Sequence, residues 1–470
     1  MGTPLLSLGA WRTLDGTGGG VPLQLPASHL VTHGVVVGMT GSGKTGLLTV
    51  MIEEALQQGV PTLVIDVKGD LPNLLLAFPS FDPALVAPWV EPGGGGEVEP
   101  VSERARRLVN ERRQSLGEWS IGEPELARYA AATSVRVLTP GARVGELVHV
   151  LSSLEQRSSR WDTDPDAARH ALSAAISLVL RLLGRDADPA SSREHVLLSV
   201  LAERRLLAGQ NAELATLMQE VLEPPIAEIG ALPMNAFLKK NERRDLAAAL
   251  NTLLASPSFA SWRQGVPLDV GAWLTPAGGR TPAVVVSVAH LDDEERALVL
   301  GVLLEDVLSW VRTLPGSSGL RALIVFDEVY GFLPPHPANP PTKRPLVALM
   351  KQARAFGVGV LVATQNPMDL DYRALSNAGF WALGRLQTDA DRARIVDGIT
   401  GEHPRSDNEA PLGDVLKRLA PRWFVVRNTH ARCGPILLQP RDTLSLLRGP
   451  MTRTEIRAAL AVGGRYDHHV

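Results

Sequence analysis

The chain has 470 residues, enough for a large hydrophobic core and an additional module. Its 47 Lys and Arg nearly balance its 50 Asp and Glu, and the formal net charge of −3 excludes the overall basic field of many nucleic-acid-binding proteins. Any DNA contact therefore has to be local. A single cysteine, Cys433, excludes an intramolecular disulfide. Without a signal-peptide pattern or a bilayer-length apolar stretch, we expect a soluble, cytoplasmic chain with no membrane contact.

Short apolar runs rich in β-branched residues, separated by helical patterns, predict an α/β fold. These runs are continuous rather than alternating, which is typical of parallel strands covered by helices on both faces. Two later runs, Trp423–Val426 and Ile436–Leu438, predict an antiparallel pair that completes the sheet. The predicted core strands are Val35–Val37, Leu63–Ile65, Val135–Leu138, Ala283–Val288, Ala322–Phe326 and Val358–Ala363.

Directly after the first core strand, the segment GMTGSGKT has the composition of a loop that binds nucleotide phosphates. Glycines let backbone N–H groups converge on the phosphates, Lys44 reaches the β- and γ-phosphates, and the Thr45 hydroxyl ligates Mg²⁺. A helical pattern over Thr45–Gln58 follows, so the loop has the flanking strand and helix that the motif requires. The sequence therefore predicts binding of ATP and Mg²⁺. The residues expected at the phosphates are Gly38, Thr40, Gly41, Ser42, Gly43, Lys44 and Thr45.

Asp66 stands at the carboxyl end of the next core strand, where the ligands of open α/β sheets gather. We expect it to face the nucleotide. A structural role, in which Asp66 or Asp70 caps the helix that begins near Leu71, accounts for the sequence equally well.

Between the third and fourth core strands the strand signal disappears and helical patterns take over, which predicts an all-α insertion in the sheet domain. The following segments are expected: an N-terminal arm (1–28), the first part of a P-loop ATPase core (29–145), the helical insertion (146–272), the second part of the core (273–445) and a C-terminal tail (446–470).

The buried strand Ala322–Phe326 ends in two acidic residues, Asp327 and Glu328. Asp327 is placed to lie beside Mg²⁺, as its second protein ligand with Thr45. Glu328 is placed to act as the general base for the attacking water. The pair implies hydrolysis of ATP.

Gln365 ends the following strand and is placed to hydrogen-bond both the γ-phosphate and the attacking water. Arg354 precedes that strand. Such an arginine can be a finger inserted into the site of the next subunit, where its planar cation offsets charge on the transferred phosphoryl group. It can equally cap the last carbonyls of its own helix. Arg385, after the next strand, is the rival finger.

In this order, GMTGSGKT, VIDVKGD, LIVFDE and KQARAFGVGVLVATQNP resemble the HerA/FtsK superfamily of ring-forming, DNA-pumping ATPases, in its HerA-like branch. The resemblance covers roughly residues 27–75 and 280–440. It implies a RecA-like P-loop core with a mostly parallel sheet and a homohexamer with ATP bound between subunits. It also matches Gln365 and Arg354 to the sensor and finger positions of the family. HerA proteins usually carry a β-barrel before the P-loop that docks a nuclease. We expect this chain to lack that barrel, and with it nuclease docking of that kind.

The leading functional hypothesis is a homohexameric motor that translocates duplex DNA in processing, repair or defence, with a nuclease or effector as a further partner. The alternative is a ring ATPase that moves or regulates a protein, as in conjugation and secretion. A nucleotide-gated assembly module with little turnover is a third hypothesis, and the presence of Glu328 argues against it. Candidate DNA contacts are the basic clusters at residues 104–113, 239–244 and 343–344.

Overall fold

The computed structural model describes the chain except for residues 1–3, 91–98, 366–369, 376–377, 387, 394–411, 432–433 and 467–470. Cys433 and the end of the predicted tail therefore lie outside the described residues.

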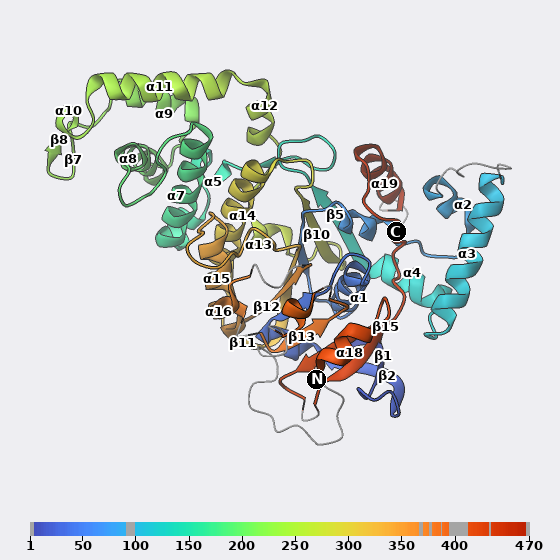
Figure 1. Cartoon of the computed structure of the whole chain (residues 1–470). Helices are drawn as coiled ribbons and strands as arrows, with labels where there is room; N and C mark the ends of the chain where they lie inside the picture. Colours follow the sequence, from blue (N-terminus) through green and yellow to red (C-terminus); the bar gives the residue numbers. More distant parts are fainter. Residues whose placement is uncertain are drawn as a thin grey trace.

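An eleven-stranded sheet forms the centre of the molecule (Figure 1). Its strands are β1 (Leu5–Arg12), β2 (Gly19–Pro26), β3 (Gly34–Val37), β4 (Thr62–Asp66), β5 (Thr133–Leu138), β10 (Thr281–Ser287), β11 (Ser317–Asp327), β12 (Phe356–Thr364), β13 (Phe380–Leu383), β14 (Phe424–Asn428) and β15 (Ile436–Pro440). Their spatial order is β2-β1-β15-β14-β13-β3-β12-β11-β4-β10-β5. From β13 to β5 all neighbours are parallel, and from β13 to β2 all are antiparallel. The predicted core strands, the final antiparallel pair and the mostly parallel sheet are confirmed.

The strands are continuously apolar because each supplies side chains to a core on both faces of the sheet. Val35 and Val37 pack into one hydrophobic cluster, and Val36, which points the opposite way, packs into the other. Leu63 and Val64 divide between the two clusters in the same manner. A parallel sheet with both faces covered therefore explains the absence of polar alternation.

Helices cover both faces of the sheet. One face carries α1 (Lys44–Gln57), α3 (Val101–Gly117), α4 (Glu123–Ala132) and α19 (Arg453–Tyr466). The other face carries α14 (Asp293–Thr313), α15 (Lys343–Gln352) and α18 (Leu412–Arg418), together with the helices of the predicted insertion. Short helices α2 (Pro83–Val86), α13 (Val270–Trp273) and α16 (Tyr372–Leu375) connect these elements.

The region of the predicted insertion is mainly helical and projects from one end of the molecule (Figure 1). Its helices are α5 (Ser152–Glu155), α6 (Arg160–Thr163), α7 (Pro165–Leu182), α8 (Arg193–Leu207), α9 (Leu214–Leu222), α10 (Met234–Phe237), α11 (Lys240–Ala255) and α12 (Pro257–Ala260). Two ladders of two residues per strand interrupt them. One pairs β7 (Glu228–Ile229) with β8 (Leu232–Pro233), and the other pairs β6 (Val148–His149) with β9 (Val266–Pro267). The second ladder joins the entry of the region to its exit.

Both ends of the chain are more ordered than their predicted description as an arm and a tail. Residues 5–26 form β1 and β2, which extend the antiparallel side of the sheet, and α19 packs against the core through Ile456 and Ala459. The five-segment division itself stays a prediction. In the part of the chain that the structure describes, no helix is both long and apolar enough to cross a membrane.

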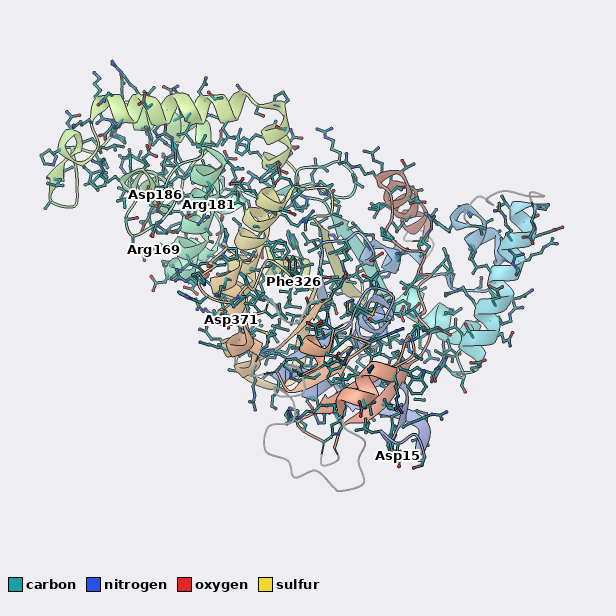
Figure 2. The ribbon with its side chains drawn as sticks, in the orientation of Figure 1. Asp15, Arg169, Arg181, Asp186, Phe326 and Asp371 are labelled. Carbon is teal, nitrogen blue, oxygen red and sulfur yellow. The ribbon has the colours of Figure 1, made fainter. Side chains whose placement is uncertain are left out.

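Side chains fill the space between the sheet and its helices (Figure 2). Phe326 on β11 lies in this interior, with its ring 5.3 Å from that of Phe332. Asp15, in the turn between β1 and β2, lies at the periphery. Strand β11 is thus held in place by close apolar packing.

Candidate nucleotide-binding site

Strand register brings most of the predicted site residues to one edge of the sheet. Val37, the residue before the P-loop, lies opposite Thr364, the residue before Gln365. Asp327 lies opposite Asp66 on the neighbouring strand. Because the parallel strands end together, the P-loop, Asp327 and Gln365 meet at their carboxyl edge, where open α/β sheets bind ligands.

The P-loop has the backbone geometry of a phosphate cradle. Gly41 and Gly43 have φ values of 78° and 95°, in the left-handed region that favours glycine. A Cβ atom at Gly43 would lie 3.1 Å from the Cα atom of Arg422. Gly43 is also the N-cap of α1, so the positive end of that helix faces the loop.

Lys44 is buried beneath this loop, with an exposed fraction of 7%. Its ammonium group donates to the carbonyl oxygens of Gly38 and of Met39, the latter at 3.3 Å. Burial, together with the nearby Lys68 ammonium, lowers the pKa of Lys44 to about 8. The loop carbonyls hold the lysine at the place where phosphate oxygens would compete for its protons.

Asp327 is a buried carboxylate with one oxygen atom that no described residue contacts by a hydrogen bond. It is 1% exposed, and its Oδ2 atom has no hydrogen-bond partner among the described residues. Burial and the neighbouring Asp66 raise the pKa of Asp327 to about 7. The described residues contain no group of three or more His, Cys, Asp or Glu able to hold a metal ion. The unpartnered carboxylate oxygen of Asp327 fits a Mg²⁺ ion that takes most of its ligands from phosphates and water.

Glu328, Gln365 and Thr40 form a hydrogen-bonded chain across the site. The backbone N–H of Gln365 and the hydroxyl of Thr364 each donate to Glu328 Oε1 at 3.2 Å. The Thr40 hydroxyl donates to Gln365 Oε1 at 2.8 Å. The predicted base, the predicted sensor and the P-loop are thus in direct contact.

Asp66 is engaged by the protein on both of its carboxylate oxygens. It is fully buried, and it accepts hydrogen bonds from the Gly69 N–H at 2.9 Å and from the Ser287 hydroxyl at 2.8 Å. Burial raises its pKa to about 6. These contacts favour the structural role over a direct nucleotide contact, since they fix the turn after β4.

The two candidate arginine fingers lie at opposite edges of the sheet. Arg385 is exposed next to the P-loop, where its carbonyl oxygen accepts from the Met39 N–H at 2.9 Å. Arg354 is exposed just before β12, so nine strand residues separate it from Gln365. At ~3.3 Å per residue this separation is about 30 Å, and Arg354 cannot reach the phosphates of its own chain.

Lys68 and Arg422 also lie at the site, although the motifs did not predict roles for them. The Lys68 ammonium lies 2.6 Å from Glu328 Oε2. The Arg422 backbone N–H donates to the Ser42 carbonyl at 2.9 Å, and the Arg422 guanidinium pairs with Asp442. Lys68 was visible in the sequence as the charged residue two positions after Asp66. No sequence pattern marks Arg422 as a site residue, because only the order of strands in the sheet brings it to the P-loop.

The basic clusters proposed for DNA are largely committed to internal contacts. Arg107 pairs with Glu99 at 2.7 Å, and Lys343 pairs with Asp371 at 3.3 Å. Other members donate to backbone carbonyls: Arg112 to Leu444 at 2.9 Å and Arg243 to Leu238 at 2.8 Å. These four residues stabilise the fold, whereas Lys239, Lys240 and Arg244 of the second cluster stay exposed.

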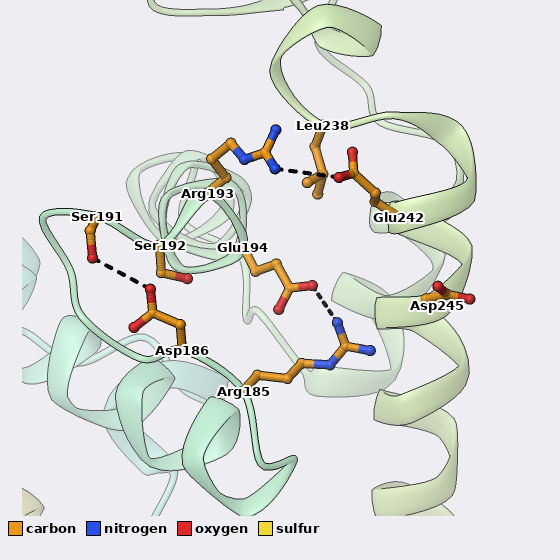
Figure 3. Close-up of a pocket in the computed structure, with 9 residues that line it drawn as sticks. All are labelled: Arg185, Asp186, Ser191, Ser192, Arg193, Glu194, Leu238, Glu242 and Asp245. Atoms are coloured by element: carbon orange, nitrogen blue, oxygen red, sulfur yellow. Dashed lines mark hydrogen bonds and ion pairs between the residues drawn. The ribbon is translucent and has the colours of Figure 1, made fainter.

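A separate hollow lies between α8 and α11, far along the chain from the P-loop (Figure 3). Arg193 pairs there with Glu242 at 3.3 Å, and Arg185 pairs with Glu194. Asp186 and Asp245 add two more carboxylates to its lining. Since its acidic residues outnumber its arginines, this hollow is unsuited to nucleotide phosphates.

Comparisons with known proteins show which family model and which solved structures the chain resembles. Residues 12–132 match the family model of the helicase HerA central domain. VirB4 of Thermoanaerobacter pseudethanolicus has a similar structure, with a TM-score of 0.50 and 14% identity over 93% of this chain and 96% of that chain. The bacterial conjugative coupling protein TrwBdeltaN70 matches with a TM-score of 0.50 and 14% identity, over 92% of this chain and 89% of that chain. TrwB in complex with a non-hydrolysable ATP analogue matches with a TM-score of 0.50 and 16% identity, over 92% of this chain and 90% of that chain. No curated protein matches the chain significantly.

The structural likenesses, at this low identity, establish a shared fold, and the family match supplies the sequence evidence. The predicted RecA-like α/β fold and the predicted resemblance to the HerA-like branch are both confirmed. The chain thus shares the fold of VirB4 and TrwB, and its residues 12–132 match the helicase HerA central domain.

Proposed function

We propose that the chain is an ATP-hydrolysing motor that assembles as a homohexamer and translocates duplex DNA. The proposal rests above all on the contact of Glu328, Gln365 and Thr40 beside Lys44 and Asp327. This is a hydrolytic arrangement rather than a simple nucleotide cradle. The match to the HerA central domain supports a motor on DNA.

In the proposed reaction, Lys44 and the backbone N–H groups of the P-loop bind the β- and γ-phosphates. Mg²⁺, held by Thr45 and Asp327, would neutralise phosphate charge. Gln365 orients a water molecule whose oxygen bonds to the γ-phosphorus while the bond to the β,γ-bridging oxygen breaks. Glu328 accepts the proton of that water, and ADP and phosphate are released.

Arg354 is assigned to the site of a neighbouring subunit, since about 30 Å separates it from its own P-loop. It lines an open hollow with Lys351 and the stacked rings of His29 and His430, whose centroids are 4.7 Å apart. No carboxylate occurs among the described residues that line this hollow. A positively charged surface of this kind suits the phosphates of an adjoining copy and supports a ring.

DNA as the substrate rests on the HerA match rather than on a basic surface. A few exposed cations per subunit, such as Lys239, Lys240 and Arg244 at α11, are multiplied in a ring. A nuclease or effector partner and a cytoplasmic location belong to the same proposal.

The decisive experiment measures the ATPase rate with and without duplex DNA across a salt series. A motor that tracks phosphates should be stimulated by DNA, and the stimulation should fade steeply as salt rises. Glu328→Gln should bind ATP but barely hydrolyse it, which controls for contaminating ATPases. If DNA of no kind changes the rate while Glu328→Gln abolishes it, the chain is an ATPase but not a DNA motor.

The second candidate function is a ring ATPase that moves or regulates a protein. Its support is that the likeness to VirB4 and to the conjugative coupling protein TrwB extends over more than nine-tenths of this chain. An ATPase rate that ignores DNA and salt would favour this candidate. The same assay therefore separates the two functions.

A further inference from the structure

Lys68 forms an ion pair with Glu328, the predicted base, and the proposed hydrolysis gives Lys68 no role. Its ammonium lies 2.6 Å from Glu328 Oε2, in an ion pair whose side chains are 31% and 12% exposed. Lys68 follows β4 while Glu328 follows β11, so the pair forms only because these strands are neighbours. A pair this sheltered is worth more than a surface ion pair.

With Lys68 in place, the protein occupies both oxygens of the Glu328 carboxylate. Oε2 receives Lys68, and Oε1 receives the Thr364 hydroxyl and the Gln365 N–H at 3.2 Å each. Glu328 also has a φ of 62°, an uncommon conformation for a residue other than glycine. A base must have a free oxygen within hydrogen-bond reach of its water. Oε1 already accepts two hydrogen bonds, so a water reaches Glu328 at Oε2, the oxygen that Lys68 holds in the nucleotide-free chain.

Lys68 is also close enough to the P-loop to act on a phosphate. Its partner Glu328 accepts from the Gln365 N–H at 3.2 Å, and the Gln365 side chain accepts from the hydroxyl of the P-loop residue Thr40 at 2.8 Å, so Lys68 lies on the P-loop side of the site. A terminal phosphate carries a charge of about −1.5 to −2 at neutral pH, more than one carboxylate. The γ-phosphate of ATP can therefore compete with Glu328 for Lys68. The terminal β-phosphate of ADP carries a similar charge, but it lies within the P-loop, one phosphate unit short of the position beside Glu328.

Building on the proposed ATPase function, we propose that Lys68 is a positioning residue that reports the γ-phosphate to Glu328. In the nucleotide-free chain Lys68 restrains Glu328. When ATP binds, Lys68 moves to the γ-phosphate and leaves Glu328 Oε2 free to receive the proton of water. ADP leaves the Lys68–Glu328 pair in place.

Binding affinities test this inference without hydrolysis. Affinities for a non-hydrolysable ATP analogue and for ADP are measured by calorimetry on wild type, Lys68→Met, Glu328→Gln and the double variant. Lys68→Met should lower the affinity for the analogue about tenfold, the scale of one charge-assisted hydrogen bond, and leave the affinity for ADP unchanged. Glu328→Gln should raise the affinity for the analogue several-fold, because Lys68 then reaches the γ-phosphate without breaking an ion pair with Glu328. In the Lys68→Met background the same change should have no effect.

Two control variants guard the interpretation. Lys68→Arg keeps the cation and should keep the preference for the analogue over ADP, and Arg181→Met, at an exposed arginine of α7, should change neither affinity. The inference fails if Lys68→Met weakens both nucleotides equally or neither. It also fails if Glu328→Gln tightens the analogue equally with and without Lys68, since the gain would then be simple loss of repulsion. A wild-type chain that binds no nucleotide would refute the proposed function itself.

Discussion

Asp327 and Asp66 lie opposite each other on β11 and β4, and their carboxyl groups have raised pKa values in the folded chain. Burial raises the pKa of Asp327 to about 7 and that of Asp66 to about 6. In an unfolded chain both would release their protons near pH 4. Below pH 4 the two states bind equal numbers of protons. As pH rises from there towards 7 the folded state keeps protons that the unfolded state has lost, so stability falls.

We predict this loss of stability for the nucleotide-free chain in the presence of EDTA. The free energy of unfolding, measured with urea, should fall between pH 4 and pH 7 by up to about 1.4 kcal/mol per pH unit for each proton retained. Asp327→Asn should flatten this slope. Asp245→Asn, at an exposed carboxylate of α11, should leave the slope unchanged. Equal slopes for wild type and Asp327→Asn would contradict the assigned environment of Asp327.

Residues of the site that belong to a local motif could be predicted from the sequence, and those brought by topology could not. Lys44, Asp327 and Gln365 each end or follow a buried strand, so a local pattern places them at the carboxyl edge. The Lys68–Glu328 pair depends on two strands being neighbours, and Arg422 depends on the return of the chain after β13. Neither contact leaves a local trace.

At the scale of elements, α1 is tied to the segment after β15 by a buried ionic group. Arg441 pairs with Glu53 at 2.9 Å and with Glu54 at 2.8 Å, and Glu53 has no exposed surface. Glu53 also accepts from the N–H groups of Leu444 and Ser445, at 2.9 and 2.8 Å. The helix that begins at the P-loop is therefore fixed at its other end by the C-terminal part of the chain.

We predict that Arg441→Met destabilises the chain by about 3–5 kcal/mol, because it leaves the Glu53 and Glu54 carboxylates buried without their cation. Denaturant unfolding at neutral pH measures the effect. Arg457→Met is the matched control, since this exposed arginine donates only to the Arg143 carbonyl, and its loss should cost less than about 0.5 kcal/mol. Similar costs for the two variants would mean that the buried group contributes little.

The core strands were predictable because each is a continuous apolar run, whereas the added strands β1 and β2 were not. Their burial is irregular, as expected near the edge of a sheet. β1 pairs with β15, from the other end of the chain, and Gly9 permits the contact: a Cβ atom there would lie 2.0 Å from the Gln439 carbonyl oxygen. Such pairing is decided by the whole fold and not by the local sequence.

At the scale of the whole molecule, the two halves of the proposed catalytic unit lie at opposite edges of the sheet. Lys44, Glu328 and Gln365 lie at the carboxyl edge, and Arg354 lies at the other, beside Lys351. A head-to-tail arrangement of identical subunits brings the first edge of one copy to the second edge of the next. Repeated around a closed ring, this contact completes every site.

Mixing two inactive variants tests this arrangement. Arg354→Ala keeps its own base but offers no finger, and Glu328→Gln offers a finger but has no base. Each alone should bind ATP and hydrolyse it at a small fraction of the wild-type rate. Where an Arg354→Ala site adjoins a Glu328→Gln subunit, both groups are present. Random mixing in equal amounts should therefore restore up to about a quarter of the wild-type rate, if sites act independently.

The control mixes Arg354→Ala with a chain that carries both changes, a combination in which no interface holds a finger and which should stay inactive. If Arg354→Ala alone keeps full activity while Arg385→Ala loses it, Arg385 is the finger. Because Arg385 lies beside the P-loop of its own chain, it would then act within one subunit, and mixing Arg385→Ala with Glu328→Gln should restore nothing. Recovery in the Arg354 mixture alone therefore requires that ATP be hydrolysed between two copies of the chain.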